Sequence, residues 1–331
     1  MKKTGVVTLT YGNRMHLLGP VLDELECLQD IFTVVVVCNG ITPEAMEQLE
    51  SRASDSHKIV LLDMGFNSGS AKGFKEGMIE VEKHSVDYIW LLDDDNLPDP
   101  EALNILKEEY AKLAPRYGGK PFCLLSYRPD RSRYRLAVLQ GDPQAVIGPD
   151  NSFLGFHWKQ KLRKAMGYKP DEQTSESRTN TGQVLVAPYG GMFFRKELLG
   201  EIGYPREEFF LYGDDHDFSY RITQAGGAII LVLDSVVRDL EVSFHLDKSA
   251  SRKRISSRFF KTDSRNAIYY SARNSIVFEQ NFVNRPFEYG VNKYIYLWAL
   301  GFAMLLRFRH LWKFSIILKA VKDSKNFYEG L

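Results

Sequence analysis

The chain has 331 residues, 44% of them hydrophobic and 26% charged, which is an ordinary globular composition and enough for one large α/β domain or two domains. Its three cysteines lack the spacing of metal ligands, which argues against a disulfide framework and favours a reducing, cytoplasmic setting. The opening MKKTGVVTLTYGNRM has only a short apolar run, so it predicts a first strand rather than a signal peptide.

Charge is distributed unevenly along the chain. The net charge is +1, but residues 248–325 carry 16 Lys and Arg against 4 Asp and Glu, a local balance of +12 that leaves −11 for the remainder. A basic region joined to an acidic body favours an anionic partner, such as a phospholipid surface, a pyrophosphate-linked acceptor or a nucleic acid. Since the chain contains no recognised nucleic-acid-binding motif, we expect no nucleic acid partner.

The first part of the chain alternates strand and helix signals. Apolar, β-branched runs predict four strands, and an Asn39-Gly40 turn follows the second of them: 4–10, 31–38, 58–62 and 87–92. Helical patterns separate these runs at 15–28, 43–50 and 69–83. The alternation predicts an α/β fold with a mainly parallel central sheet, right-handed crossovers and helices on both faces.

The pattern weakens after residue 115. It predicts further strands at 122–127, 134–139, 183–188 and 229–237, and helices at 195–202 and 214–221. Residues 159–178 are lysine-rich and then acidic, which predicts a mobile loop that could close over the site as a lid. We place the boundary between a catalytic domain and a basic, aromatic, helical C-terminal region after residue 247.

The C-terminal region also carries apolar segments. Residues 294–306 form an uncharged run of 13 residues, shorter than the about 20 that span a bilayer. Residues 307–321 predict an amphipathic helix in a membrane interface, with Trp298 and Trp312 as anchors. The alternative is a helix packed on the protein's own core or on a second subunit. We expect a cytoplasmic protein held at the inner face of the plasma membrane, and homo-oligomer formation stays open.

Three consecutive carboxylates follow the predicted strand at 87–92. Side chains alternate along an extended segment, so Asp93 and Asp95 can point the same way while Asp94 points elsewhere. Clustered carboxylates repel one another, and a divalent cation with oxygen ligands relieves that repulsion. The position after a strand of an α/β sheet favours a cation site over the alternative, an acidic loop that caps the next helix.

A second acidic cluster lies in FFLYGDDHDFSYR. Asp214, Asp215 and Asp217 start a predicted helix, whose N-terminus stabilises a carboxylate and keeps it available as a base. The alternative is simple capping by Asp214. His245 follows a later strand; one such histidine is more often structural, and only the acidic clusters make it a candidate metal ligand.

The residues together resemble the family 2 glycosyltransferases with the GT-A fold, over residues 3–245. The resemblance rests on VVTLTYGNR, VVCNG, the small-residue loop GFNSGSAKGF, LLDDDN, and YGDDHDF followed by a late histidine. It implies a nucleotide-sugar donor, usually a UDP-sugar, and a Mn²⁺ or Mg²⁺ ion. The chain departs from the family where Cys38 stands in place of a usual Asp or Asn.

The resemblance assigns residues to the donor. Thr10 and Tyr11 would line the nucleobase pocket, and Asn39 would lie near the base or the ribose. Asn67 and Lys72 would face the nucleotide and its phosphates.

It also assigns the metal and the base. Asp93 and Asp95 match the D-x-D pair that holds the metal and donor, with Asp94 between them assigned to the donor. His245 matches the late metal-binding histidine. Asp215 matches the base that activates the acceptor hydroxyl, and Asp214 would orient the acceptor or tune Asp215.

The subgroup follows from YGDDHDF, the late histidine and YYSARN, which resemble bacterial galactofuranosyltransferases and the related rhamnosyltransferases. The resemblance implies an inverting transfer from UDP-galactofuranose to a hydroxyl of a growing cell-surface glycan or lipid-linked acceptor. A dTDP-rhamnose enzyme is the leading alternative. A nucleotidyltransferase would carry a basic glycine-rich loop after its first strand, which residues 10–17 do not supply. A non-catalytic, membrane-attached binding protein would not need Asp93, Asp95 and Asp215.

Overall fold

The computed structural model describes residues 2–167, 179–241, 258–306 and 310–327. The chain forms two compact units. The first comprises Met1–Val146, Ser175–Phe210 and Asp214–Val242, and the second comprises Ile147–Thr174, Leu211–Gly213 and Ser243–Leu331. Each unit is described by itself.

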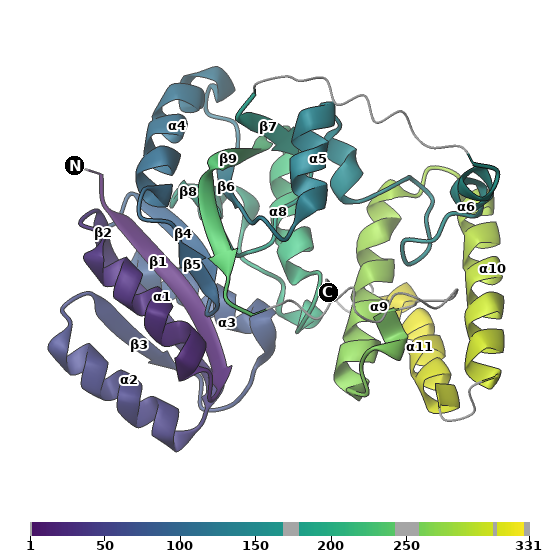
Figure 1. Ribbon diagram of the computed structural model, residues 1–331, viewed down its shortest axis with the longest axis horizontal. Helices are drawn as coiled ribbons and strands as arrows, with labels where there is room; N and C mark the ends of the chain where they lie inside the picture. The colour runs from purple at the N-terminus through teal and green to yellow at the C-terminus, as the bar shows by residue number, and fades with distance from the viewer. Residues whose placement is uncertain (1, 168–178, 242–257, 307–309, 328–331) are drawn as a thin grey trace. The chain divides into compact units, whose positions relative to one another are not determined.

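The first unit is built on a nine-stranded sheet within the described residues (Figure 1). Four parallel strands form one half, in the order β3-β2-β1-β4: β1 (Thr4–Gly12), β2 (Ile31–Ile41), β3 (Ile59–Asp63) and β4 (Tyr88–Asp93). Val7 lies between Val35 and Leu91 in this register. Near-continuous Val, Ile and Leu runs form these strands because helices cover the sheet on both faces.

The other half mixes strand directions. β6 (Phe122–Tyr127) runs parallel to β9 (Ala228–Asp239), and three short strands are antiparallel: β5 (Asn96–Pro98), β7 (Thr181–Val184) and β8 (Met192–Arg195). β8 joins β4 to β6. The carboxyl ends of β4, β6 and β9 therefore belong to one continuous sheet, and such ends are where α/β folds bind ligands.

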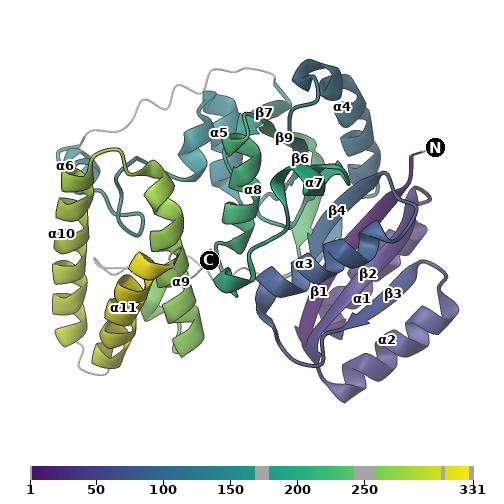
Figure 2. The same ribbon diagram turned by 180° about the vertical axis from the view of Figure 1, so that it is seen from behind.

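Helices cover both faces of this sheet. One face carries α1 (Met15–Cys27) and α4 (Ala102–Tyr117), as Figure 1 shows, and the other carries α3 (Gly69–Glu82) and α8 (Asp214–Gln224), seen in Figure 2. Helix α2 (Pro43–Asp55) and the short helix α7 (Leu198–Ile202) complete this part of the unit.

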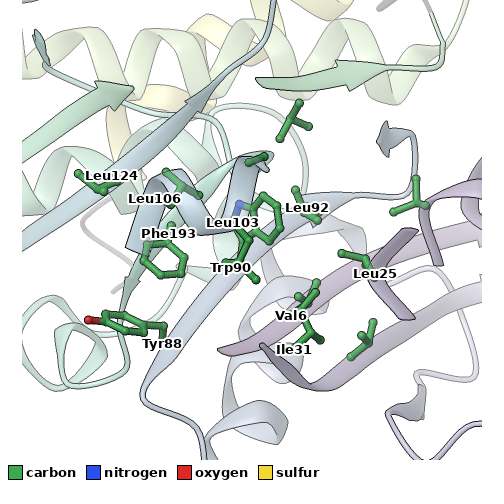
Figure 3. Close-up of a cluster of buried hydrophobic side chains, with 14 of the residues drawn as sticks. Val6, Leu25, Ile31, Tyr88, Trp90, Leu92, Leu103, Leu106, Leu124 and Phe193 are labelled. Carbon is green, nitrogen blue, oxygen red and sulfur yellow. The ribbon is translucent and has the colours of Figure 1, made fainter. Parts of the chain in front are cut away.

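The core between the sheet and α1 and α4 is apolar and closely packed (Figure 3). Trp90 is fully buried at its centre, and the Tyr88 ring stacks on Phe193 with centroids 4.8 Å apart. Leu103 and Leu106 of α4 close the cluster from above the sheet. This burial fixes β4, and with it the position of the carboxylates that follow, on a rigid element.

Helix α3 approaches the sheet closely at Gly77. A Cβ atom there would lie 2.5 Å from Cγ1 of Val7 and 2.7 Å from Cγ2 of Val37. We expect Gly77→Ala to lower the free energy of unfolding by about 1–3 kcal/mol, because overpacking forces the helix away from the sheet. Gly200→Ala in α7 is the matched control: nothing lies within 4 Å of its Cβ, so we expect a gain of about 0.5–1 kcal/mol. Urea unfolding measures both, and equal effects would contradict this packing.

Several element predictions were wrong in detail. Residues 134–139 lie in helix α5 (Ser132–Gln140) rather than in a strand. Ala137 and Val138 are buried side by side while Leu136 is exposed, which fits a helix, and Gly141 ends it with a φ of 63°. The predicted Asn39-Gly40 turn lies inside β2, which continues to Ile41.

Further along, two predicted segments are divided differently. The predicted helix at 195–202 begins only at Leu198, because Arg195 closes β8, a strand that the sequence reading missed. The first part of the predicted lid forms helix α6 (Trp158–Ala165), and residues 168–178 lie outside the described residues.

The second unit is helical. Its main helices are α9 (Arg265–Glu279), α10 (Pro286–Leu305) and α11 (Leu311–Asp323), with α6 beside α10. Its core includes Phe153, Ile268, Leu300 and Ile317. Trp312, one of the two predicted membrane anchors, is partly buried against this core, whereas the other, Trp298, is exposed. Among the helices of the described residues, none is long and apolar enough to cross a membrane.

Candidate active site

Acidic side chains gather around one guanidinium at the carboxyl ends of β4, β6 and β9. Arg128 directly follows β6 and donates from Nη1 to Asp93 Oδ2 over 3.1 Å and from Nη2 to Asp239 Oδ2 over 2.7 Å. The side chains of Arg128 and Asp239 are only 5% and 4% exposed, whereas that of Asp93 keeps 39%. Asp93 is therefore the member of this trio that a ligand can reach.

Asn96 holds the acidic turn in shape. Its amide nitrogen donates to Asp95 Oδ1 over 3.0 Å and to Asp239 Oδ1 over 2.9 Å. Its carbonyl oxygen accepts the backbone N–H of Asp93 over 3.1 Å. Since Asn96 is fully buried, these bonds fix the backbone of the triple-acid segment against β9.

Asp94 points to a different set of partners. It accepts the Thr10 hydroxyl over 2.8 Å and two Arg14 nitrogens, Nε over 2.8 Å and Nη2 over 3.1 Å. Asp94 and Thr10 are both buried. The two side chains that the sequence analysis assigned to the donor therefore hydrogen-bond within the protein itself. Tyr11 is different: it is 47% exposed, and the Arg14 guanidinium lies 5.0 Å from its ring centre.

The carboxylates of Asp93 and Asp95 favour protonation more than an ordinary aspartate does. Burial raises the pKa of Asp93, with Arg128 opposing the change. Burial and then the charge of Asp93 raise the pKa of Asp95 to about 7. A divalent cation would relieve this repulsion, so the donor set fits such an ion. Among the described residues no three acidic, His or Cys side chains form a ready metal cluster, and His245 lies outside those residues.

The small-residue loop before α3 is held by Asn39. The buried Asn39 side chain accepts both the backbone N–H and the hydroxyl of Ser68 over 2.8 Å, and donates to Gly69 O over 3.2 Å. Asn67 is exposed, and Lys72 Nζ lies 3.5 Å from Glu207 Oε2. The sequence reading assigned Asn39 to the base or ribose; the structure uses its amide to shape the loop.

The second acidic cluster separates a buried carboxyl from an accessible one. Asp214 is buried, accepts the Ser70 hydroxyl over 2.8 Å, and has a pKa raised to about 7 by burial and by the charge of Asp215. Asp215 is half-buried at the start of α8 and accepts the backbone N–H of His216 over 2.8 Å. Asp217 pairs with Arg206 over 2.9 Å and is structural.

The two acidic clusters meet in space. The charge of Asp215 contributes to the raised pKa of Asp93, although 122 positions separate them in the chain. The segment Tyr189-Gly190 lies against both: a Cβ at Gly190 would lie 2.7 Å from Asp93 Oδ2, and the buried Tyr189 hydroxyl adjoins Asp214 without a well-formed hydrogen bond. This segment therefore connects the surroundings of Asp93 with those of Asp214, the neighbour of Asp215.

The turn that precedes Asp214 in the chain is strained. Phe210 and Tyr212 have φ angles of 61° and 65°, in the left-handed region that favours glycine. Within the second unit, the Asn274 amide donates to Leu211 O and to Tyr212 O over 2.8 Å each. The YYSARN segment thus satisfies the carbonyls of this turn, and strain of this kind is common at functional sites.

Asp214 makes the stability of the fold depend on pH. Its folded-state pKa of about 7 lies above the ordinary 3.8, so its stabilising contribution is complete below the unfolded value and is lost as pH rises through 7. The side chain of Asp214→Asn stays neutral at every pH. As the pH rises from about 4 to about 7, we expect this variant to lose less thermal stability than the unmodified protein. Asp234→Asn, at an exposed aspartate of β9, is the control in the same melting series. If the melting temperatures of all three proteins changed equally with pH, the raised pKa of Asp214 would be contradicted.

Sequence reasoning missed Arg128, Asp239 and Asn96. Arg128 follows the predicted strand at 122–127, and Asp239 comes two residues after the predicted strand at 229–237. Charged residues placed directly after predicted strands were the available signal. What could not be read is that β6 and β9 are neighbours, which brings the two residues together.

Solved structures share this architecture. The chain aligns with GalNAc-T7 bound to UDP, GalNAc and Mn²⁺ at a TM-score of 0.55 and 12% identity, over 85% of this chain and 48% of that one. It aligns with the mannosyltransferase PcManGT from Pyrobaculum calidifontis, in complex with GDP-Man and Mn²⁺, at a TM-score of 0.51 and 16% identity, over 98% and 75%. These likenesses confirm the predicted fold class, a GT-A glycosyltransferase fold.

Sequence comparisons assign the chain to one family of glycosyltransferases. Residues 17–258 match the family described as Glycosyltransferase like family 2, and the chain belongs to that family. It is 28% identical over 165 residues to galactofuranosyltransferase GlfT1 of Mycobacterium tuberculosis, covering 48% of this chain and 45% of that protein. It is 24% identical over 204 residues to GlfT1 of Mycolicibacterium smegmatis, covering 58% of this chain and 56% of that protein. The chain thus spans about half the length of the curated relatives it matches.

Proposed function

We propose that this protein transfers a sugar from a nucleotide-sugar donor to an acceptor hydroxyl, with inversion at the anomeric carbon. The observation that carries the proposal is that one segment, Tyr189-Gly190, lies against both acidic clusters: Gly190 beside Asp93, and Tyr189 beside Asp214, the neighbour of Asp215. The first suits a cation and a diphosphate, and the second suits removal of a proton from an alcohol. Family membership supports the same reaction class.

Asp215 is the base in this proposal. It is the accessible carboxylate in the first turn of α8, beside the buried Asp214. It takes the proton of the attacking hydroxyl, so that the acceptor oxygen bonds to the anomeric carbon as the bond to the diphosphate breaks. The buried carboxyl of Asp214, bonded to Ser70, tunes and orients Asp215 without meeting the acceptor.

Asp93 and Asp95 would hold Mn²⁺ or Mg²⁺, and His245 stays the proposed third ligand. A bound ion supplies Lewis-acid stabilisation of the negative charge on the departing nucleoside diphosphate. The chain's own contribution is to bind and orient the donor. The exposed ring of Tyr11 lies near the carboxyl end of β1 and that of Phe66 lies in the loop after β3, where they can stack on a nucleobase. Asn67 belongs to the same loop as Phe66, and Lys72 lies in the first turn of α3.

We place the donor as UDP-galactofuranose because the matched relatives are named galactofuranosyltransferases. The test is a panel of nucleotide sugars, including dTDP-rhamnose, assayed with Mn²⁺ and an acceptor glycan. Release of UDP from UDP-galactofuranose alone would support this donor, and turnover of dTDP-rhamnose alone would overturn it. Release of pyrophosphate would indicate a nucleotidyltransferase, and no reaction with any donor would favour a non-catalytic binding protein.

For the acceptor, we propose a chemical class. A growing cell-surface glycan, free or linked to a lipid pyrophosphate, fits the basic C-terminal region with its excess of 12 positive charges over residues 248–325. A lipid-linked acceptor would also place the enzyme at the inner face of the plasma membrane.

A further inference from the structure

Helix α10 carries an apolar stripe that its own unit does not cover. The stripe consists of seven exposed side chains, four of which follow one another at intervals of three or four residues, and the last lies one residue past the helix end: Phe287, Tyr294, Ile295, Trp298, Phe302, Leu305 and Leu306. Trp298 is 74% exposed, and Phe302 stacks on it with ring planes 4° apart and centroids 5.8 Å apart. From residue 294 to the end of the helix the sequence contains no charged residue. A continuous apolar surface of this kind marks an interaction site.

A basic helix lies at the N-terminal end of this stripe. The backbone N–H of Trp158, at the start of α6, donates to Asn292 Oδ1 of α10 over 2.8 Å. Lys159 pairs with Glu288 over 2.6 Å. Both views show α6 beside that end of α10 (Figures 1 and 2). The two helices therefore present a joint surface of the second unit.

Helix α6 is amphipathic and exposed along its length. Leu162 and Met166, four residues apart, are 49% and 69% exposed. Lys161, Arg163 and Lys164 are exposed as well, and within the part of the chain that the structure describes none of the three forms an ion pair. Within the described residues, the helix therefore offers unpaired cations beside exposed apolar side chains.

We propose that the α10 stripe and α6 form one surface that docks the protein on an anionic phospholipid membrane. Apolar and aromatic side chains enter the boundary between headgroups and acyl chains, while lysine and arginine side chains reach lipid phosphates. Charge favours this occupant over a second copy of the chain, because a copy would present the same basic helix and the same positive C-terminal region. The surface includes Trp298, one of the two anchors that the sequence pattern predicts, and adds helix α6 to it.

The test is co-sedimentation of the full chain with vesicles of phosphatidylcholine alone and with vesicles that also contain phosphatidylglycerol. We expect binding to the second kind only, weakened by high salt because the charges are exposed. Lys161→Glu combined with Lys164→Glu should lower the partition coefficient by at least roughly tenfold, since each basic residue near an anionic surface contributes severalfold. Trp298→Ser combined with Phe302→Ser should abolish the binding that persists in high salt.

Two matched controls lie in the first unit. Lys112→Glu reverses a charge on a side chain that is 62% exposed on α4, and Phe32→Ser removes an exposed ring of β2; both should sediment like the unmodified protein. Melting curves would check that every variant is folded. Absence of vesicle binding by the unmodified chain would overturn the proposal. So would unchanged binding by the Trp298 and Phe302 variant together with conversion of a dimer to a monomer in light scattering, which would show an interface between copies.

Discussion

Asp215→Asn should abolish sugar transfer and leave donor binding unchanged. General-base catalysis commonly contributes about 10²–10⁴-fold, and an amide cannot accept the proton of the acceptor hydroxyl. The substitution preserves shape, because the amide oxygen still accepts the His216 N–H that Asp215 accepts now. The measurement is the transfer rate with saturating donor and acceptor, set against the donor dissociation constant from calorimetry.

The matched control for this substitution is Asp234→Asn, at an exposed carboxylate of β9 in the same unit, which should transfer at the unmodified rate. A fall in donor affinity as large as the fall in rate would assign Asp215 to donor binding or to the structure. An unaffected rate would remove it as the base.

Asp95→Asn should remove the dependence of donor binding on Mn²⁺. Substituting a residue that only supports metal ligands commonly costs about 10–100-fold in affinity, so loss of a ligand itself should cost at least that much. The Asn96 amide bonded to Asp95 can still donate to the new carbonyl oxygen, so the turn keeps its shape. Calorimetric titration of UDP, with and without Mn²⁺, measures the effect.

Asp99→Asn is the control for this second substitution, because Asp99 lies near the same turn but pairs with the exposed Arg238 over 2.8 Å. It should retain the Mn²⁺ dependence. Titration curves for Asp95→Asn that match those of the unmodified protein would show that Asp95 is not a ligand.

The parallel half of the fold could be predicted because each of its strands has a distinctive local sequence pattern. Residues 34–37 are four consecutive valines, buried on both faces of the sheet, and no other element accommodates such a run. β8 has only four residues, and its place between β4 and β6 depends on partners far away in the chain. Residues 134–139 misled because a short apolar segment can form either a strand or a helix.

The site could be predicted in part for the same reason. Alternation along the strand end separates Asp94 from Asp93 and Asp95, and the structure gives Asp94 its own partners. Which polar groups the fold itself consumes could not be read. Thr10 and Asn39 looked available, yet the structure commits their side chains to Asp94 and to the loop at Ser68.

The position of Arg128 among Asp93, Asp95 and Asp239 has a consequence for how the protein is made. A guanidinium keeps its proton at every physiological pH, so part of the repulsion at these strand ends is cancelled from the moment the sheet assembles. In some metal-binding domains the counter-charge comes from the ion itself, and binding of the metal is then coupled to folding. Because Arg128 supplies part of that counter-charge, we expect newly synthesised chains to reach their native form in a metal-starved cell.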